Sequence, residues 1–168
     1  MPFTPFHFGP GAAIHAAAPT HVSFLAFCGA NVLVDVEPLY YILTGQFPLH
    51  RFFHTYVGVS LVVIGAAGLF SAALAVARVL QMPNILGWRS LGAVNVFVGA
   101  GLGGYSHVVL DSIMHSDIRP LAPFSSANLL YQIIPTSDLH WWCLVAGIVG
   151  LVLLGFRRGF SSISTSLP

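Results

Sequence analysis

Charged residues are scarce in this sequence. Only 7% of its 168 residues are charged, lysine is absent, and the six basic residues are all arginine. A soluble domain carries about 25% charged residues. The formal net charge of +1 provides no basic surface for nucleic acid. With 56% hydrophobic residues the chain has enough apolar surface to fold, which excludes a disordered protein. The composition therefore indicates a membrane protein.

Cysteine is also scarce. Cys28 and Cys143 lie in apolar runs without the spacing of a metal knuckle or a disulfide framework, so we interpret both as small buried residues. The N-terminus lacks the basic segment and compact apolar core of a signal peptide. Histidine, in contrast, is the commonest ionisable residue type, with eight copies against five acids. This excess is the first indication of function.

Long apolar runs are plentiful. A helix needs about 20 apolar residues to cross a bilayer core of about 30 Å. Because four runs reach this length, the sequence predicts an all-α integral membrane bundle with four transmembrane helices, preceded by a helix of half that length. We expect one domain over residues 1–158, a disordered polar tail over 159–168, and a short interfacial helix from Ser125 to Gln132. The predicted spans are 21–43, 53–79, 88–115 and 139–156.

The arginines predict the orientation. Arg78 and Arg89 flank the loop between the second and third runs, and Arg157 and Arg158 follow the fourth run. By the positive-inside rule these ends face the cytoplasm. The C-terminus is then cytoplasmic. The opposite ends of the helices face outward, and they carry Arg51 and Arg119.

Ionisable residues of the third run follow one another at intervals of four. His107, Asp111 and His115 stay within about 80° of one helix face while rising about 12 Å. That rise is too long for three ligands of one ion. It suits two ions, or one ion with a substrate-binding or supporting residue. A histidine and an aspartate four residues apart form a chelating pair for zinc or a similar divalent ion.

Two histidines at the start of the second run, His50 and His54, are also four residues apart, and Arg51 lies between them. Arg51 could clamp an anionic oxygen, or it could neutralise Asp35 or Glu37 near the end of the first run. The first run ends, the second begins and the third ends on the same side of the membrane. The predicted topology therefore brings these residues to one depth near the non-cytoplasmic face.

Three interpretations of this polar group stay open. It could be a metal centre, a structural ion-pair cluster, or part of a proton or ion pathway. The cytoplasmic halves of the runs carry almost no polar residue besides Asn95, which argues against a continuous pathway. We expect Asp117 in a solvated loop close enough to support the group. The remaining histidines follow no pattern and are expected at the interface: His15, His21 and His140.

Several motifs occur in a fixed order over residues 1–125. They are Thr-x-x-His with a following glycine (4–9), Asp35, His-Arg-x-x-His-Thr (50–55) and Ser-His-x-x-x-Asp (106–111). In this combination the chain resembles a family of small, LexA-regulated bacterial inner-membrane proteins described as metal-dependent hydrolases. That family commonly has Pro-Asp-x-Asp where this chain has Asp35 and Glu37. The helical His-x-x-x-Asp spacing is also remotely similar to that of zinc-dependent phospholipases C and single-strand-specific nucleases.

The resemblance implies a metal-dependent hydrolase of the bacterial inner membrane that binds a divalent ion. We expect this ion to be zinc, with manganese and iron as alternatives. At the membrane face its substrate would be a phosphoester or another anionic, lipid-like molecule. We expect Arg51 to hold an anionic substrate oxygen and Glu37 to serve as general base. The alternative is a non-enzymatic metal or proton carrier, or a scaffold. The expected ligands are Asp35, His54, His107 and Asp111, with His7, His50 and His115 as further ligands or supporting residues.

Overall fold

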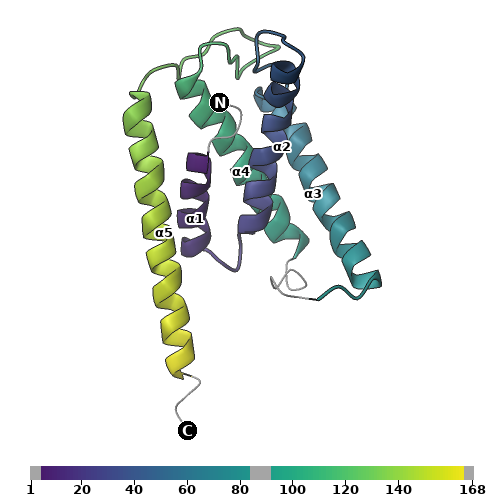
Figure 1. Ribbon diagram of the computed structural model, residues 1–168, viewed down its shortest axis with the longest axis vertical. Helices are drawn as coiled ribbons and strands as arrows, with labels where there is room; N and C mark the ends of the chain where they lie inside the picture. Colours follow the sequence, from purple (N-terminus) through teal and green to yellow (C-terminus); the bar gives the residue numbers. More distant parts are fainter. Residues whose placement is uncertain (1–4, 84–91, 165–168) are drawn as a thin grey trace.

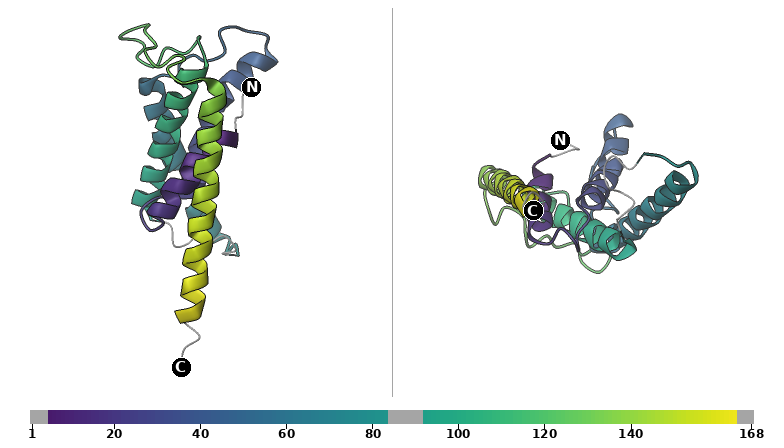
Figure 2. Two further views of the ribbon diagram at one scale, coloured as in Figure 1. Left: turned by 90° about the vertical axis from the view of Figure 1, so that its left-hand side faces the viewer. Right: turned by 90° about the horizontal axis from the view of Figure 1, so that it is seen from below.

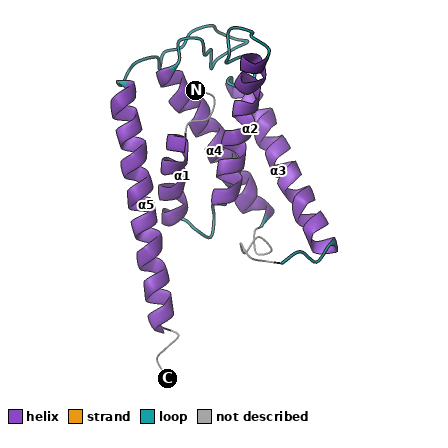
Figure 3. Cartoon of the chain, viewed as in Figure 1, coloured by secondary structure: helices purple, strands orange, loops and turns teal. Residues whose placement is uncertain are grey.

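The computed structural model describes residues 5–83 and 92–164, with side chains up to residue 157. Thr4 and Arg89, which enter the sequence argument, lie outside these ranges, as do residues 165–168 of the expected tail and the side chain of Arg158. Within them all regular structure is helical, so the all-α prediction is confirmed (Figures 1 and 3). The elements are a 3-10 turn η1 (Pro5–His7), α1 (Phe8–Ala17), α2 (Phe24–Leu43), α3 (Tyr56–Val79), α4 (Ala93–Met114) and α5 (Thr136–Ser164).

Four of these helices are long and apolar enough to cross a membrane: α2, α3, α4 and the first 22 residues of α5. Helix α1 has only 10 residues, so it rises about 15 Å and covers half of a bilayer core. The outer faces of the helices carry many exposed large hydrophobic residues, among them Leu69 on α3 and Leu151 on α5. Such an apolar surface is suited to lipid rather than water. The chain is a multi-pass membrane protein.

Helix α4 occupies the centre of the arrangement. It packs on α2 and α3, whereas α1 packs chiefly on α5, and weaker contacts join these two groups (Figures 1 and 2). The interior of the three-helix group is built from small and β-branched side chains, which allow the helices to approach closely. Its buried core includes Ala26, Ala30, Val34, Val59, Val96, Ala100 and Val108.

Two glycines set the contact between α4 and α2. A Cβ atom on Gly99 would collide with the backbone oxygen of Ser23, and one on Gly103 with the backbone oxygen of Phe27. Gly99 and Gly103 are four residues apart, a small-residue spacing that predicts close packing of membrane helices, and the structure confirms it. The close approach also places polar side chains of the two helices opposite each other.

The loops at one end of the bundle complete the polar region. The segments 44–55 and 115–135 both cross this end, at the top of Figure 1. The backbone N–H of Tyr56 donates to the carbonyl of Pro120 at 2.8 Å, and that of Gln132 to the carbonyl of Ile113 at 2.9 Å. Thr55 also caps α3 by accepting from the N–H of Gly58. The bonds of Tyr56 and Thr55 anchor the end of the loop that carries His50 and His54, and the bond of Gln132 ties the other loop to α4.

Two expectations about local structure differ from what is observed. Residues 125–128 are irregular and residues 129–132 form turns, in place of the predicted interfacial helix. The amide of Asn128 instead donates to the carbonyl of Ser112 at 2.9 Å and lies 3.4 Å from that of His115, and such side-chain bonds to backbone compete with helix formation. At the other end α5 continues to Ser164, past the predicted limit at Phe156 and into the expected tail.

Candidate metal centre

Four buried side chains meet near the upper end of the bundle. Asp35 comes from α2, His54 from the loop before α3, and His107 and Asp111 from successive turns of α4. One ligand atom from each lies within 4.8 Å of the others. These are the four residues named first as ligands from the sequence. The close packing of α2 on α4 and the fixed loop bring them together.

The spacing of the donor atoms suits a small divalent ion. Nε2 of His107 lies 3.3 Å from Oδ1 of Asp35 and 3.3 Å from Oδ2 of Asp111, and Nε2 of His54 lies 3.5 Å from the same Oδ2. Donors bonded at about 2.0–2.1 Å to one tetrahedral zinc ion lie about 3.3–3.4 Å apart. Two imidazoles and two carboxylates are also a donor set that zinc, manganese and iron accept.

The second ring nitrogen of each of these histidines is held by an acceptor. Nδ1 of His107 lies 3.1 Å from Oδ1 of Asn31, and Nδ1 of His54 lies 3.4 Å from Oε2 of Glu37. An acceptor at Nδ1 keeps the proton there, so Nε2 presents its lone pair to the group. Metal-binding histidines in proteins are oriented in this way.

Glu37 organises the histidine loop as well as His54. Its Oε2 accepts the backbone N–H of Arg51 at 3.1 Å and that of Phe53 at 2.9 Å. These contacts with the loop could not be foreseen from helix spacing. Its contacts identify a positioning residue for His54.

Several polar atoms that face the centre have no hydrogen-bond partner among the described residues. Within the described chain, the buried and unpartnered side-chain atoms are Nε2 of His54, Nε2 of His107, Oδ1 of Asp111 and both ring nitrogens of His7. Buried polar atoms are ordinarily hydrogen-bonded, and exceptions point to a missing ion, a missing water or a catalytic role. Nε2 of His54 and Nε2 of His107 both lie beside Oδ2 of Asp111. One cation there would satisfy both nitrogens.

His7 approaches the same carboxylate from η1. Its Nε2 lies 3.3 Å from Oδ1 of Asp111, and its ring meets that of His107 edge-on at 4.7 Å. Burial lowers the pKa of His7 to about 4, against the opposing attraction of Asp111. The ring is therefore neutral at pH 7 and keeps a lone pair for a ligand.

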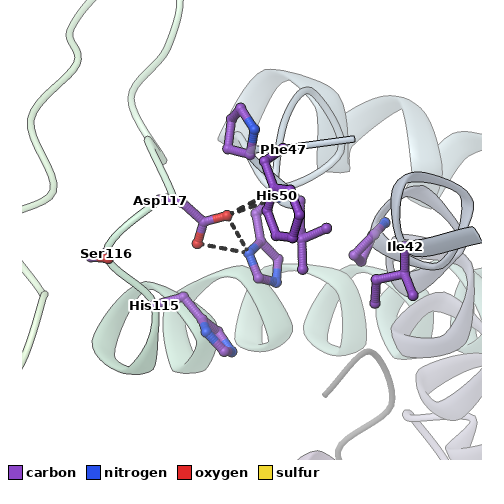
Figure 4. A pocket seen from close by; sticks show the side chains of 9 residues that line it. Ile42, Phe47, His50, His115, Ser116 and Asp117 are labelled. Carbon is purple, nitrogen blue, oxygen red and sulfur yellow. Dashed lines mark hydrogen bonds and ion pairs between the residues drawn. The ribbon is translucent and has the colours of Figure 1, made fainter. Parts of the chain in front are cut away.

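A second group shares Asp111 with the first. His50, from the loop before α3, and His115, at the end of α4, each offer a ligand atom within 4.8 Å of one another and of Asp111. Nδ1 of His50 lies 2.9 and 3.0 Å from the two carboxylate oxygens of Asp117, as Figure 4 shows. Burial and the neighbouring His54 lower the pKa of His50, although Asp117 opposes this shift.

The two histidines of the second group border a cavity of about 650 Å³. The His50 and His115 rings, which stack at 4.5 Å, lie on its polar side with Ser116 and Asp117 (Figure 4). The rest of the wall is apolar: Pro38, Ile42, Phe47, Pro48 and Leu49. The first group, whose four members are all buried, does not line this cavity.

Arg51 is held by its own loop. Its Nε donates to the carbonyl of Pro48 at 3.0 Å, and its guanidinium lies 3.7 Å above the ring of Tyr41. Arg51 and Arg119 both line a neighbouring cavity of about 520 Å³, which shares His50 and Asp117 with the first cavity. The two basic side chains at this end of the bundle thus lie beside the polar group without entering it.

Asn31 received no role from the sequence, although it shares a helix face with Asp35, a spacing that could have marked it as a partner of the group. The sequence places Asp117 in a solvated loop close enough to support the group, and its carboxylate indeed contacts His50. That His50 is its partner depends on a loop path that no periodicity reports. Of the histidines expected at the interface, His140 stacks on Phe6 at 4.5 Å and His15 bonds to the carbonyl of Val22 at 2.7 Å.

Comparison with known proteins assigns no family. No family model matches the chain, and no curated protein or solved structure matches it significantly. The geometry of the polar group is therefore the main indication of function.

Proposed function

We propose that the protein is a membrane-embedded, metal-dependent hydrolase. The proposal is carried by the convergence of two imidazoles and two carboxylates in a buried group. Nε2 of both histidines lacks a hydrogen-bond partner in the described part of the chain. Zinc is the first candidate, with manganese and iron as alternatives. When bound, such an ion would polarise a scissile group and activate water near neutral pH.

The residues of the group divide into ligands and supports. His54 and His107 would supply neutral nitrogens, and Asp35 and Asp111 would supply the two negative charges that balance a divalent cation. Glu37 accepts two backbone N–H groups through the same oxygen that faces His54. We therefore assign Glu37 to orienting His54, in place of the general-base role expected from the sequence.

The surroundings favour an anionic substrate with an apolar part. The cavity beside the second group combines a polar side with an apolar wall, and Arg51 and Arg119 line the neighbouring cavity. Guanidinium groups suit phosphate oxygens. A lipid or lipid-linked phosphoester at the membrane face would satisfy both features, with Arg51 or Arg119 holding its anionic oxygen.

The location of the site supports one orientation. Arg78, in the last turn of α3, and Arg157, on α5, lie toward the ends opposite the polar group. Basic residues favour the cytoplasmic side, so the proposed centre faces outward from a bacterial inner membrane and the C-terminus is cytoplasmic.

The test combines metal content with turnover of a phosphodiester. The full chain is purified in detergent without a metal-binding tag, loaded with zinc or manganese, and assayed on bis(p-nitrophenyl) phosphate and on phospholipid vesicles. We expect hydrolysis to fall to background in His107→Ala and Asp111→Ala, together with loss of metal. His140→Ala, which removes a histidine outside the group, should hydrolyse like the wild type. Equal turnover by the two ligand variants, or a folded wild type that takes up no metal, would refute the proposal.

A further inference from the structure

The carboxylate of Asp111 lies between two sets of histidines. Its Oδ2 lies 3.3 Å from Nε2 of His107 and 3.5 Å from Nε2 of His54. Its Oδ1 is buried, lies 3.3 Å from Nε2 of His7 and has no hydrogen-bond partner in the described chain. One ion beside Oδ2 would leave Oδ1 available to a second cation.

His50 and His115 provide the other ligands that such a cation needs. Each has a ligand atom within 4.8 Å of the other and of Asp111. The rings stack with 28° between their planes. They come from the loop before α3 and from the end of α4, so two separate elements deliver nitrogens to one place.

The orientation of His50 is fixed for ligation. Asp117 accepts from Nδ1 of His50 through its side chain and also from the backbone N–H groups of Leu49 and His50, at 3.1 and 3.2 Å. Nδ1 is occupied, so the free ligand atom of His50 is Nε2. This repeats the arrangement of His54 with Glu37 and of His107 with Asn31.

We propose that the protein binds two divalent ions that share Asp111 as a bridging carboxylate, with the second ion held by His50, His115 and Asp111. This inference rests on the proposed metal centre and extends it. The first group is wholly buried, whereas His50 and His115 line the cavity of about 650 Å³. The second ion is thus the one that a substrate in the cavity meets. Paired ions in hydrolases stabilise both the attacking and the leaving oxygen of a phosphoester.

Zinc stoichiometry tests the inference. The full chain in detergent is dialysed against buffered zinc, and zinc per chain is measured by mass spectrometry. We expect two ions in the wild type, one for each group. His115→Ala should retain half of that zinc, as should Asp35→Asn, while Asp111→Asn should lose more than either. His140→Ala is the matched control and should bind as the wild type does.

The outcomes separate the two proposals. One zinc ion in both the wild type and His115→Ala would overturn the second site and leave the proposed hydrolase centre standing. A folded wild type without zinc would overturn both. Two ions that survive in His115→Ala would place the second ion elsewhere and refute the assignment.

A spectroscopic measurement covers the case in which variants fold poorly. Wild type loaded with manganese should give the exchange-coupled electron paramagnetic resonance signal of two ions joined by a carboxylate. The signal of isolated manganese at full loading would refute the bridge.

Discussion

Asn31 holds the imidazole of His107 in one orientation across the contact between α2 and α4. The amide nitrogen of Asn31 donates to the carbonyl of Phe27 at 3.0 Å and to that of Gly103 at 3.1 Å. With both donor bonds made, its Oδ1 is the atom left to face Nδ1 of His107, at 3.1 Å. The carboxamide is thus locked, and the proton of His107 stays on Nδ1.

The first prediction is that Asn31→Leu weakens zinc binding. Loss of an orienting partner of a metal ligand typically costs about 10- to 100-fold in affinity, because the ring of His107 can then turn or change tautomer. The affinity is measured by competition with a chromogenic chelator. Asn95→Leu is the matched control, since the Asn95 amide bonds only to the carbonyl of Thr20, at 2.7 Å, within the described contacts. Equal affinity in wild type and Asn31→Leu would show that the amide does not orient the ligand.

Much of the fold could be predicted from apolar run lengths, because a membrane span must be both long and apolar. The common depth of Asp35, His54 and Asp111 followed from the alternation of those spans. The partners of the ligands did not follow. Asp117 reaches His50 through loops whose paths depend on tertiary contacts. The loss of the helix predicted after Ser125 depends on tertiary contacts as well.

The continuation of α5 has a different cause. A helix that has nucleated extends at little cost per residue, and no proline occurs after Pro135 until Pro168. The serine-rich composition of 159–168 favours a disordered tail, but no proline interrupts the helix before Ser164, and Gly159 costs only about 1 kcal/mol.

The second prediction concerns the approach of α2 to α4. Gly103→Ala should destabilise the protein and release metal, because the new methyl group collides with the backbone oxygen of Phe27. Overpacking in a core costs about 1–3 kcal/mol. Gly101→Ala, whose methyl group would meet nothing within 4 Å, should be neutral or stabilising. Thermal unfolding and zinc content of both variants test this. A Gly103→Ala protein with wild-type stability and zinc would show that the contact can relax.

The third prediction separates two roles for Glu37. As a positioning residue, Glu37 orients His54 and the N–H groups of Arg51 and Phe53, so Glu37→Gln should lower zinc affinity and Glu37→Leu should lower it further. A general base would give another result, in which Glu37→Gln keeps its zinc and loses turnover. Zinc affinity and phosphodiester turnover measured on the same preparations distinguish them. Normal affinity with lost turnover would restore the general-base assignment.

The fourth prediction concerns orientation in the membrane. Phe124, 87% exposed in the loop at the site end, and Leu80, 66% exposed at the end of α3, mark opposite ends of the bundle. Single cysteines at these positions, with Cys28 and Cys143 replaced by alanine, are treated in intact spheroplasts with an impermeant maleimide. We expect labelling of Phe124→Cys at once and of Leu80→Cys only after permeabilisation. The reverse order would place the metal centre on the cytoplasmic side.

The fifth prediction is that metal removal lowers the melting temperature. An ion that binds only the folded state at 100 times its Kd adds about 2.7 kcal/mol of stability, and each kcal/mol shifts the melting temperature of a protein this size by about 2–4 °C. Without the ion, Nε2 of His54, Nε2 of His107 and Oδ1 of Asp111 stay buried and unpartnered within the described chain. A chelator should therefore lower the melting temperature of the wild type by several degrees, and added zinc should restore it. The His107→Ala/Asp111→Ala protein starts without the ion and should not respond. A drop of the same size in that variant would mean that the chelator acts on some other part of the protein–detergent complex.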